Sequence, residues 1–376
     1  MKKKLNKSLC IFLNLGDSIE NQINSGQWDR FLNEYIKRYA YCFQKVYLIS
    51  YGQKHELNNL PKNLEILVNK YGLHRFVFTF LIPIIFAKQI AMCQVSRTMQ
   101  ATGGIPAIIA QWLFNVPAVI NYGYDYSAFA RLNINIIMGW ITKIYTHLIL
   151  LFANKIIVTT KLLQKSLSMF KEKTIYIPNG VNLQNFQIKT NYSLHSPIRI
   201  TSIGRLTDQK RFDYLLEIAN LINESANIEV TLVGNGKNER ILKNIAKKYD
   251  ISLNIIPKLN HQEIAKFLRN QDFYIHCSEI EGHPKALLEA LASGLPTLVS
   301  AHHKIDYSFL GKLADIIILP FNANIVSKQI FDLINNQSLR QQIGLIGREL
   351  VESNFDIQDT LIKEINLLRS LASKRL

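Results

Sequence analysis

Two glutamates, Glu281 and Glu289, stand eight positions apart in a segment rich in glycine and proline. We expect this segment to be a loop after a strand that then opens a helix, with Pro284 at the first helical position. Glu289 would lie about five residues, or roughly 7.5 Å, along that helix, and Glu281 would precede it. Either glutamate alone could be a solvated helix-cap residue. Together they can face one cleft and accept hydrogen bonds from sugar or ribose hydroxyls.

The start of the same helix has a second chemical property. Backbone N–H groups at His283 to Lys285, together with the positive end of the helix dipole, form a natural site for phosphate. Gly282, Gly294 and Pro296 complete a strand-loop-helix-strand unit around it. Carboxylates beside a phosphate site suit a sugar nucleotide.

A cationic pair follows an earlier strand. Gly204 and Arg205 precede Lys210, and a guanidinium and an ammonium projecting from one loop can hold a diphosphate and neutralise it as it departs. On their own these cations could equally be solvated surface charges. The expected position at the same sheet edge as the glutamates favours diphosphate binding. Gly234 and Gly236 form a Gly-x-Gly pattern after the next strand, which also fits a plain turn.

Short β-rich runs alternate with longer helical patterns, which is typical of α/β proteins with parallel sheets. In the first half we expect strands at Leu9–Leu15, Lys45–Ser50, Leu64–Val68, Ala118–Asn121 and Lys155–Val158. In the second half we expect strands at Ile198–Ile203, Glu229–Val233, Leu253–Ile256, Phe273–Cys277 and Thr297–Ser300. Asp208 is the expected N-cap of the helix that contains Phe212 and Leu215. Function should lie at the carboxyl ends of the strands.

The length of 376 residues predicts about two domains. We expect an N-terminal acceptor-side domain over residues 1–186 and a nucleotide-sugar-binding domain over 187–355. A C-terminal helix over 356–376 could pack back on the first domain.

The motifs resemble, in identity and order, those of the retaining glycosyltransferases of family 4, which have the GT-B fold. The resemblance rests on Pro178-Asn179-Gly180-Val181, Gly204-Arg205-Leu206 with Lys210, Gly234-Asn235-Gly236, and the block from Glu281 to Pro296. It covers the second half closely and the first half in outline. It implies two doubly wound, Rossmann-like domains that face an interdomain cleft.

The resemblance also implies roles for single residues. Arg205 and Lys210 would bind the donor diphosphate, Glu281 would contact the sugar hydroxyls, and Glu289 would hold the ribose. Glu281, Arg205 and Lys210 are the expected catalytic residues. The other expected donor-binding residues are Gly204, Gly234, Gly236, Gly282, His283, Pro284 and Lys285.

The first half departs from the family pattern. The family's glycine-rich loop after the first strand has its expected counterpart in Ser25-Gly26-Gln27, before a helix from Trp28. Where the family often has a histidine, this chain has none in Asn121–Asp125, and Tyr122, Tyr124 and Asp125 are the candidates there. The phenylalanine usual after Glu281-Gly282 is His283 here.

Positive charge is concentrated in the first half. Residues 1–190 hold 22 Lys and Arg against 8 Asp and Glu, whereas residues 191–376 hold 22 against 20. Such asymmetry indicates an anionic partner, although a general lysine excess would produce it too. No nucleic-acid module is present, so we predict no nucleic-acid partner. An anionic membrane surface is favoured by the basic residues that flank the apolar segment Arg75–Lys88, for which a buried core helix is the alternative.

Neither of the two most apolar stretches, Phe76–Ala87 and Ile134–Ala153, is expected to span a bilayer. The four cysteines have no metal or disulfide spacing, which indicates a reducing cytoplasm. We therefore predict a cytoplasmic protein, peripheral on the inner face of the cell membrane.

The sequence contains no Asp-x-Asp motif, so we predict metal-independent transfer and no cofactor. The predicted reaction is retaining transfer of a hexose or related sugar from a nucleotide-diphosphate sugar to a saccharide or lipid-linked saccharide, in surface polysaccharide or lipopolysaccharide assembly. A nucleotide-sugar epimerase, with Asp17 and Asp125 as acid/base candidates, and a non-catalytic carbohydrate-binding protein are the alternatives. A glycosidase would also use two carboxylates but would leave Arg205 and Lys210 without a role.

Overall fold

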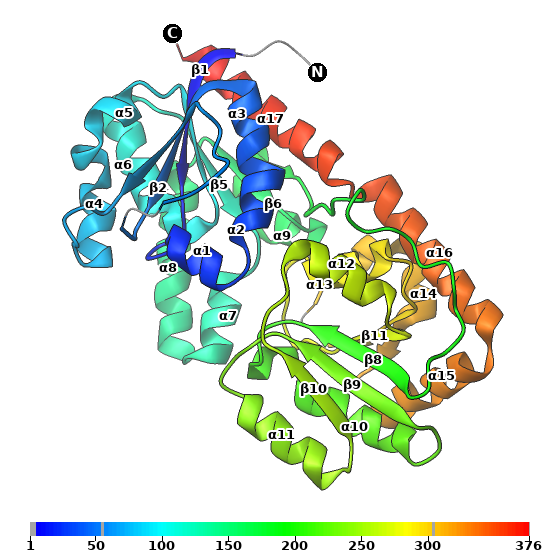
Figure 1. Cartoon of the computed structure of the whole chain (residues 1–376). Coiled ribbons are helices and arrows are strands. Elements are labelled where there is room, and N and C mark those ends of the chain that lie inside the picture. Colours follow the sequence, from blue (N-terminus) through cyan, green and yellow to red (C-terminus); the bar gives the residue numbers. More distant parts are fainter. Residues whose placement is uncertain (1–4, 54–55, 303–304, 376) are drawn as a thin grey trace. The chain divides into compact units, whose positions relative to one another are not determined.

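The computed structural model describes residues 5–53, 56–302 and 305–375, and the chain divides into two compact units. The first unit comprises Met1–Pro178 and Asp359–Leu376, and the second comprises Asn179–Gln358. The sequence-based boundary lies at 186, somewhat later than this division. Each unit is an α/β structure around one parallel sheet (Figure 1).

The first unit contains a seven-stranded sheet in the order β3-β2-β1-β4-β5-β6-β7, with every recorded strand pair parallel. Its strands are β1 (Leu5–Phe12), β2 (Phe43–Ser50), β3 (Leu64–Val68), β4 (Val95–Thr98), β5 (Ala118–Tyr122), β6 (Lys155–Val158) and β7 (Thr174–Tyr176). Its α-helices are α1 (Ile19–Asn24), α2 (Trp28–Arg30), α3 (Lys37–Cys42), α4 (Arg75–Ile85), α5 (Ala87–Ala91), α6 (Gly104–Phe114), α7 (Tyr126–Asn133), α8 (Ile136–Phe152), α9 (Lys161–Ser166) and α17 (Ile357–Lys374). A π-helical stretch, Phe31–Ile36, joins α2 to α3.

The second unit contains a six-stranded parallel sheet in the order β10-β9-β8-β11-β12-β13. Its strands are β8 (Ile198–Ile203), β9 (Ile228–Val233), β10 (Ser252–Ile256), β11 (Phe273–His276), β12 (Thr297–Ala301) and β13 (Ile318–Pro320). Its α-helices are α10 (Phe212–Asn223), α11 (Glu239–Lys248), α12 (His261–Arg269), α13 (Lys285–Ala292), α14 (Ala314–Ile317), α15 (Ala323–Asn335) and α16 (Gln337–Asn354). The two helix-flanked parallel sheets confirm the predicted GT-B class of fold.

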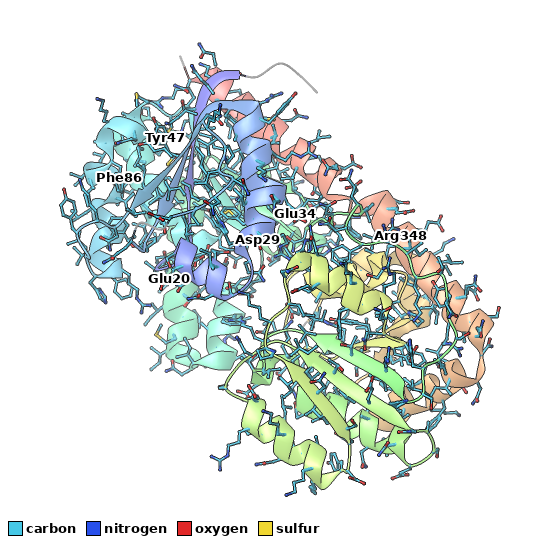
Figure 2. All side chains as sticks on the ribbon, in the orientation of Figure 1. Glu20, Asp29, Glu34, Tyr47, Phe86 and Arg348 are labelled. Carbon is cyan, nitrogen blue, oxygen red and sulfur yellow. The ribbon has the colours of Figure 1, made fainter. Side chains whose placement is uncertain are left out.

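The strands of both sheets are covered on both faces, and such strands have continuous apolar sequences. In the first unit, Tyr47 of β2 and Phe86, between α4 and α5, belong to one buried core and are labelled in Figure 2. In the second unit, Arg348 of α16 donates hydrogen bonds to the carbonyl oxygens of Phe186 and Ala292 (2.6 Å for Ala292). These bonds tie the segment before β8 and the end of α13 to α16.

The strand predictions were wrong at several places. The first strand begins and ends earlier than Leu9–Leu15, because Leu5 already pairs with Phe43 of β2. β4, β7 and β13 were not predicted, because all three are short and β4 consists of Val95, Ser96, Arg97 and Thr98, three of which are polar. All four residues of β4 are nevertheless buried.

The last helix, α17, supplies the counterion of Arg97, the charged residue of the buried strand β4. Arg97 and Glu364 form a buried ion pair, and the Glu364 carboxylate also accepts a hydrogen bond from the Tyr39 hydroxyl. Further along, Arg375 donates to the carbonyl oxygens of Ala91 (3.1 Å) and Phe114 (2.6 Å). Helix α17 is therefore an integral layer of the first unit.

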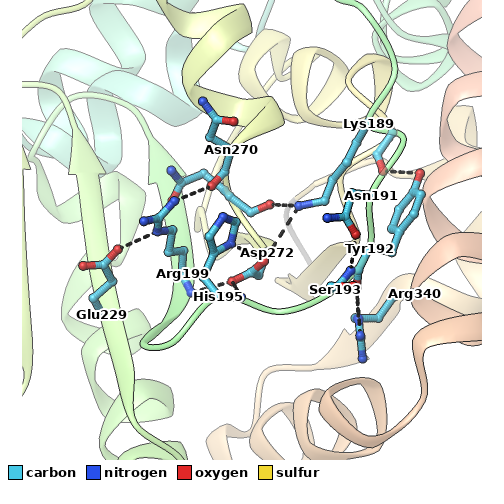
Figure 3. Close-up of polar contacts among 12 residues, drawn as sticks. Lys189, Asn191, Tyr192, Ser193, His195, Arg199, Glu229, Asn270, Asp272 and Arg340 are labelled. Atoms are coloured by element: carbon cyan, nitrogen blue, oxygen red, sulfur yellow. Dashed lines mark hydrogen bonds and ion pairs between the residues drawn. The ribbon is translucent and has the colours of Figure 1, made fainter.

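A polar network fastens the segment that leads into β8 (Figure 3). The Asp272 carboxylate lies 2.9 Å from His195 Nδ1 and accepts a hydrogen bond from the Arg199 backbone N–H (2.9 Å), while Lys189 Nζ donates to the Gln271 carbonyl (2.5 Å). Arg340 Nη2 donates to the Tyr192 carbonyl (2.8 Å). Asp272 directly precedes β11, so the network lies at the amino ends of the strands, where residues of parallel sheets serve stability.

Among the residues that the structure describes, no helix combines the length and the apolar composition needed to cross a bilayer.

Candidate active site

The strand order of the second sheet places two loops opposite each other. β8 lies between β9 and β11, so the chain runs to one side after β8 and to the other side after β11. In open parallel sheets, ligands bind outside the carboxyl ends of strands at such a switch point. The loop after β8 carries Arg205 and Lys210, and the loop after β11 carries Ser278 and Glu281.

Backbone contacts hold these two loops together. The Glu279 N–H donates to the Gln209 carbonyl (2.8 Å), and the Gln209 side-chain amide donates to the Ile280 carbonyl (2.6 Å). Gln209 is buried in the middle of a 3₁₀ turn, Asp208–Lys210. The turn therefore fixes the start of the Lys210 side chain beside the loop that carries Glu281.

Lys210 and Glu281 form an ion pair in which the ammonium donates to the carboxylate, and the two side chains are 16% and 15% exposed. The Ser278 hydroxyl donates to the same carboxylate oxygen at 3.1 Å. Burial opposes ionisation of Glu281, but the positive charge of Lys210 and these hydrogen bonds prevail and hold the pKa of the carboxyl below its usual value. Glu281 is thus a fixed, charged acceptor.

Behind this pair lies a neutral histidine. His276, the last residue of β11, is 3% exposed, and burial together with the neighbouring Lys210 charge lowers its pKa to about 4. Its Nε2 atom has no hydrogen-bond partner among the described residues. The Tyr307 ring packs edge-on against the imidazole with centroids 6.1 Å apart.

Tyr274 of β11 is a buried residue whose ionisation is opposed by the charge of both glutamates. Burial raises the pKa of the Tyr274 hydroxyl, and the negative charges of both Glu281 and Glu289 raise it further. Glu281, in the loop after β11, and Glu289, within α13, belong to one strand-loop-helix unit, and their joint role at a ligand stays a prediction.

Glu289 has a partner that the sequence did not reveal. Its Oε1 atom lies 3.3 Å from Nε2 of His261, and both side chains are largely buried. His261 is the first residue of α12, and its ring packs against Phe186 with centroids 5.1 Å apart. No spacing rule links position 261 to position 289, because the contact joins two helices from different βα units.

Three glycines lie where the loops after β8 and β9 meet. A Cβ atom at Gly204 would lie 2.7 Å from Lys210 Cε, so the lysine side chain runs directly over this glycine. A Cβ at Gly234 would lie 2.0 Å from the Gly204 carbonyl oxygen, and one at Gly236 would lie 2.4 Å from that of Leu206. The Gly-x-Gly pattern therefore permits close backbone approach between the loops after β8 and β9.

Arg205 differs from Lys210. Its side chain is exposed, and it forms no hydrogen bond or ion pair with another described residue. Its backbone nitrogen lies close to Gly234, since a Cβ atom added at Gly234 would be 3.7 Å from it. A free guanidinium in this position is available to an anionic ligand.

Two predictions for helix starts were wrong. Asp208 does not cap α10, because Arg211 in the left-handed region (φ 51°) is the N-cap. Asp208 instead accepts hydrogen bonds from Lys237 (2.5 Å) and Asn238 (2.7 Å), which ties the loops after β8 and β9 together. Pro284 is the N-cap residue of α13, and the helix begins one residue later, at Lys285.

His283, between Gly282 and Pro284, is buried and held by contacts with other residues of the second unit. Its ring is buried against Phe309 and Phe355, with centroids 4.6 and 5.0 Å away. Its Nδ1 atom accepts a hydrogen bond from the Asn179 backbone N–H (3.2 Å), and its carbonyl accepts one from the Asn179 amide (2.8 Å). Burial lowers the pKa of this imidazole to about 3, so it is neutral at physiological pH.

The first-unit candidates lie in two separate loops. Gly26 (φ +72°) follows α1, whereas the loop directly after β1 contains Gly16 (φ +74°). Tyr122 ends β5, and Asp125 is the N-cap of α7, where its carboxylate accepts from the Ala128 N–H (3.0 Å). The Tyr124 ring stacks beside Tyr126 with centroids 4.1 Å apart.

The switch point of the first sheet lies between β1 and β4, and the sequence analysis did not find it. The loop after β1 carries Asn14, whose buried Oδ1 atom has no hydrogen-bond partner among the described residues, and Asn121 of β5 has the same property. A Cβ at Gly103, after β4, would lie 2.4 Å from the Leu13 carbonyl oxygen. The Gly103-Gly104 pair was the available signal, but it is informative only once β4 is recognised as a strand.

Comparison with known proteins defines the class of the second unit. Residues 185–350 match the family described as glycosyl transferases group 1. The predicted resemblance to the glycosyltransferases is therefore confirmed at this level.

Individual relatives are more distant. The chain is 33% identical to protein CapJ of Staphylococcus aureus over 164 residues, which cover 41% of each chain. It is 27% identical to the UDP-Gal:alpha-D-GlcNAc-diphosphoundecaprenol alpha-1,3-galactosyltransferase of Escherichia coli over 228 residues, 55% of this chain and 57% of that protein. The chain thus spans about half the length of the curated relatives it matches.

Among solved structures, sucrose-phosphate synthase from Thermosynechococcus elongatus is similar to the whole chain. It has a TM-score of 0.76 at 16% identity, over 98% of this chain and 100% of that chain. At this identity the likeness concerns the fold.

Proposed function

We propose that this chain is a glycosyltransferase that takes a sugar from a nucleotide-diphosphate sugar bound to its second unit. The observation that carries the proposal is the Lys210–Glu281 pair at the switch point between β8 and β11, together with Arg205 in the same loop, whose side chain has no partner among the described residues. A diphosphate needs cations and a sugar needs fixed acceptors, and this sheet edge offers both. The group 1 glycosyltransferase match over residues 185–350 supports the proposal independently.

The proposed roles follow from the charges. Arg205 can bind the diphosphate through its planar guanidinium. The Lys210 ammonium has three N–H donors, so it can keep Glu281 and still donate to a phosphate oxygen. As the bond from sugar to phosphate breaks, negative charge grows on the leaving diphosphate. Each preorganised donor can lower the barrier by about 3 kcal/mol.

The carboxylates have different proposed partners. Glu281 is ionised and held by Ser278, so it can accept hydrogen bonds from hydroxyls of the donor sugar. Glu289 would accept from the ribose hydroxyls with its remaining lone pairs, while His261 orients it. Gly204, Gly234 and Gly236 would let the nucleotide approach the backbone, and the helix start at Gly282–Lys285 would contribute N–H groups.

The finer features of the reaction come from the family resemblance and the sequence. We propose retention of the anomeric configuration, with the leaving phosphate oxygen helping to take the acceptor's proton. We also propose transfer without a metal ion or cofactor, since the chain has no Asp-x-Asp motif and Arg205 and Lys210 can neutralise the diphosphate.

The proposed acceptor is a saccharide or lipid-linked saccharide in surface polysaccharide or lipopolysaccharide assembly, recognised by the first unit. The Escherichia coli relative is named for a GlcNAc-diphosphoundecaprenol acceptor, which is anionic and lipid-linked. The positive charge of residues 1–190 suits such an acceptor. We further propose that the protein acts in the cytoplasm at the inner face of the membrane, without nucleic acid.

The test begins with donor binding. A panel of UDP-, GDP- and ADP-sugars is added to the purified protein, and the matching donor should raise the melting temperature because it binds only the folded state. Release of nucleoside diphosphate is then followed with and without saccharide or lipid-linked acceptors. Turnover that depends on an acceptor supports transfer, whereas conversion of the sugar without an acceptor would show an epimerase.

Variants connect the reaction to the site. Arg205→Gln and Glu289→Gln should each reduce turnover by roughly 100-fold or more with little change in melting temperature. Arg240→Gln, at an exposed arginine of α11, is the matched control and should behave as wild type. Wild-type turnover in Arg205→Gln and Glu289→Gln would reject these roles.

A further inference from the structure

Helix α8 exposes an apolar face that no described part of the first unit covers. Along Ile136–Phe152, exposed apolar side chains recur every three or four residues, which places them on one face of the helix. They are Ile136 (61%), Ile137 (67%), Trp140 (58%), Ile141 (52%), Ile144 (60%), Leu148 (51%), Leu151 (44%) and Phe152 (41%). The opposite face, with Gly139, Ile149 and Leu150, is buried. An apolar face of this size belongs against another apolar surface or medium.

The exposed face extends to the neighbouring helices. Helices α4, α6 and α8 contribute to the core on the same side of the first sheet, and α6 contacts both others (Figure 1). Trp112 of α6 is 59% exposed, and its ring packs against Phe152 with centroids 5.0 Å apart. The exposed side chains Phe76, Val77, Phe80 and Ile84 of α4 add to the same layer of helices. Isolated exposed apolar residues are ordinary, but a set this large marks an interaction surface.

The loop between α7 and α8 continues the apolar face. α7 and α8 pack side by side as a helical hairpin, and Leu132 and Ile134, at their junction, are 39% and 62% exposed. Asn135 caps α8 by accepting a hydrogen bond from the Met138 N–H (2.8 Å). The junction is therefore an ordered, apolar turn.

Positive charge predominates in the part of the sequence that contains this face. Between residues 126 and 176 the chain has seven Lys and Arg but only one acidic residue, Glu172. The Lys143 ammonium lies over the Trp140 ring, 5.3 Å from its centroid. Lys173 Nζ donates to the Leu151 carbonyl (2.7 Å) at the end of α8, so a cation borders the apolar side chains there.

We propose that the face formed by α8 and the α7–α8 turn inserts into the headgroup and upper acyl region of a bilayer that contains anionic phospholipids. Apolar side chains would enter the acyl boundary, tryptophan would sit at headgroup level, and the lysines would contact lipid phosphates. A second copy of this chain is a poorer occupant, because a two-fold interface would bring two cationic borders together. Such docking would present a lipid-linked acceptor to the enzyme, and only this link rests on the proposed function.

The experiment compares vesicles of phosphatidylcholine with vesicles of phosphatidylcholine and phosphatidylglycerol, by flotation of the full chain. Wild type should float with the anionic vesicles. The triple variant Ile137→Ser/Trp140→Ser/Ile144→Ser should bind these vesicles roughly 1,000-fold more weakly, because burial of each large apolar side chain contributes on the order of tenfold. The matched control Ile241→Ser/Ile325→Ser/Leu345→Ser, which alters exposed apolar residues of the second unit, should bind as wild type.

A second triple variant tests the contribution of the lysines to membrane binding. Lys143→Gln/Lys165→Gln/Lys171→Gln should lose the preference for phosphatidylglycerol, and added salt should have the same effect on wild type. Both triple variants should keep the wild-type melting temperature, because the altered side chains are exposed. Release of nucleoside diphosphate with a soluble acceptor is measured separately, so a failure of lipid binding is distinguishable from a failure of transfer.

Three results would overturn the proposal. Wild type could fail to float with anionic vesicles, or the Ile137/Trp140/Ile144 variant could float as well as wild type. A wild-type dimer that this variant converts to a monomer would show instead that the face binds a second copy.

Discussion

The ammonium of Lys210 donates to the carboxylate of Glu281, a residue 71 positions away, and both side chains are largely buried. The two groups that sequence reasoning assigned to opposite ends of the donor, phosphate and sugar, are thus in direct contact. One side chain therefore sets the charge and position of the other.

This contact predicts the behaviour of a double-mutant cycle. Lys210→Met should lower the free energy of unfolding by about 3 kcal/mol, because it leaves a buried carboxylate without its counterion. Adding Glu281→Gln should recover much of that loss while transfer stays abolished. Urea unfolding of the single and double variants measures the coupling.

The exposed pair Lys237–Asp208, with side chains 66% and 67% exposed, provides the control. Lys237→Met should change the free energy of unfolding by less than about 1 kcal/mol. Additive effects of Lys210→Met and Glu281→Gln would contradict the proposed dependence.

Gly204 and Gly234 should respond differently to alanine. At Gly204 the added Cβ meets only the flexible end of Lys210, so Gly204→Ala should displace the ammonium. We expect weaker donor binding by about tenfold and little loss of stability, with thermal shift as the measurement. At Gly234 the Cβ meets the backbone of Gly204, so Gly234→Ala should lower the melting temperature strongly. Equal effects at both positions would show that Lys210 does not depend on the glycine beneath it.

Two buried histidines predict acid sensitivity. The native-state pKa values of His276 (about 4) and His283 (about 3) lie below the ordinary value of 6.5. The unfolded chain therefore binds protons that the native state does not, and stability is fully present above about pH 6.5. It should be lost as the pH falls toward 4, by on the order of 3 kcal/mol for His276 alone.

Melting temperatures between pH 7 and pH 4 measure this dependence. His283→Phe, which restores the side chain usual in the family, should make the slope shallower. His74→Gln, at an exposed position, should leave it unchanged. A slope in His283→Phe as steep as that of wild type would exclude His283 as a cause.

The buried Arg97–Glu364 pair predicts that α17 stabilises the first unit. Glu364→Ala should reduce the free energy of unfolding by about 3 to 5 kcal/mol, because it leaves the Arg97 charge buried and unpaired. Glu352→Ala removes the half-exposed partner of Arg348 and should cost less than about 1 kcal/mol. Denaturant unfolding followed by tryptophan fluorescence reports the first unit, because Trp28, Trp112 and Trp140 all lie there. A similar loss in both variants would contradict this role of Glu364.

The second unit could be predicted in more detail than the first. Its strands have the apolar runs of buried parallel strands, and the Gly204, Gly234 and Glu281 motifs follow those strands at the sheet edge. The partner of Glu289 could not be predicted, because His261 reaches it only through the packing of α12 beside α13. β4 was missed because its burial depends on Glu364, which is 267 positions away from Arg97.

The same distance in sequence explains why the candidate residues of the first domain could not be assigned to one site. Without β4 the switch point between β1 and β4 cannot be found, and Gly103 and Asn14 have no recognisable context. Tyr122 ends β5, and Tyr124 and Asp125 lie in the loop after it, but sequence alone did not show that Asp125 caps α7.

The contribution of α17 to the first unit also sets an order for folding during synthesis. Residues Asn179–Gln358 are continuous, so the second unit can fold as soon as they leave the ribosome. The first unit is made earlier, but Arg97 has no counterion until Glu364 emerges. The half of the protein that is translated first is therefore the half that is completed last.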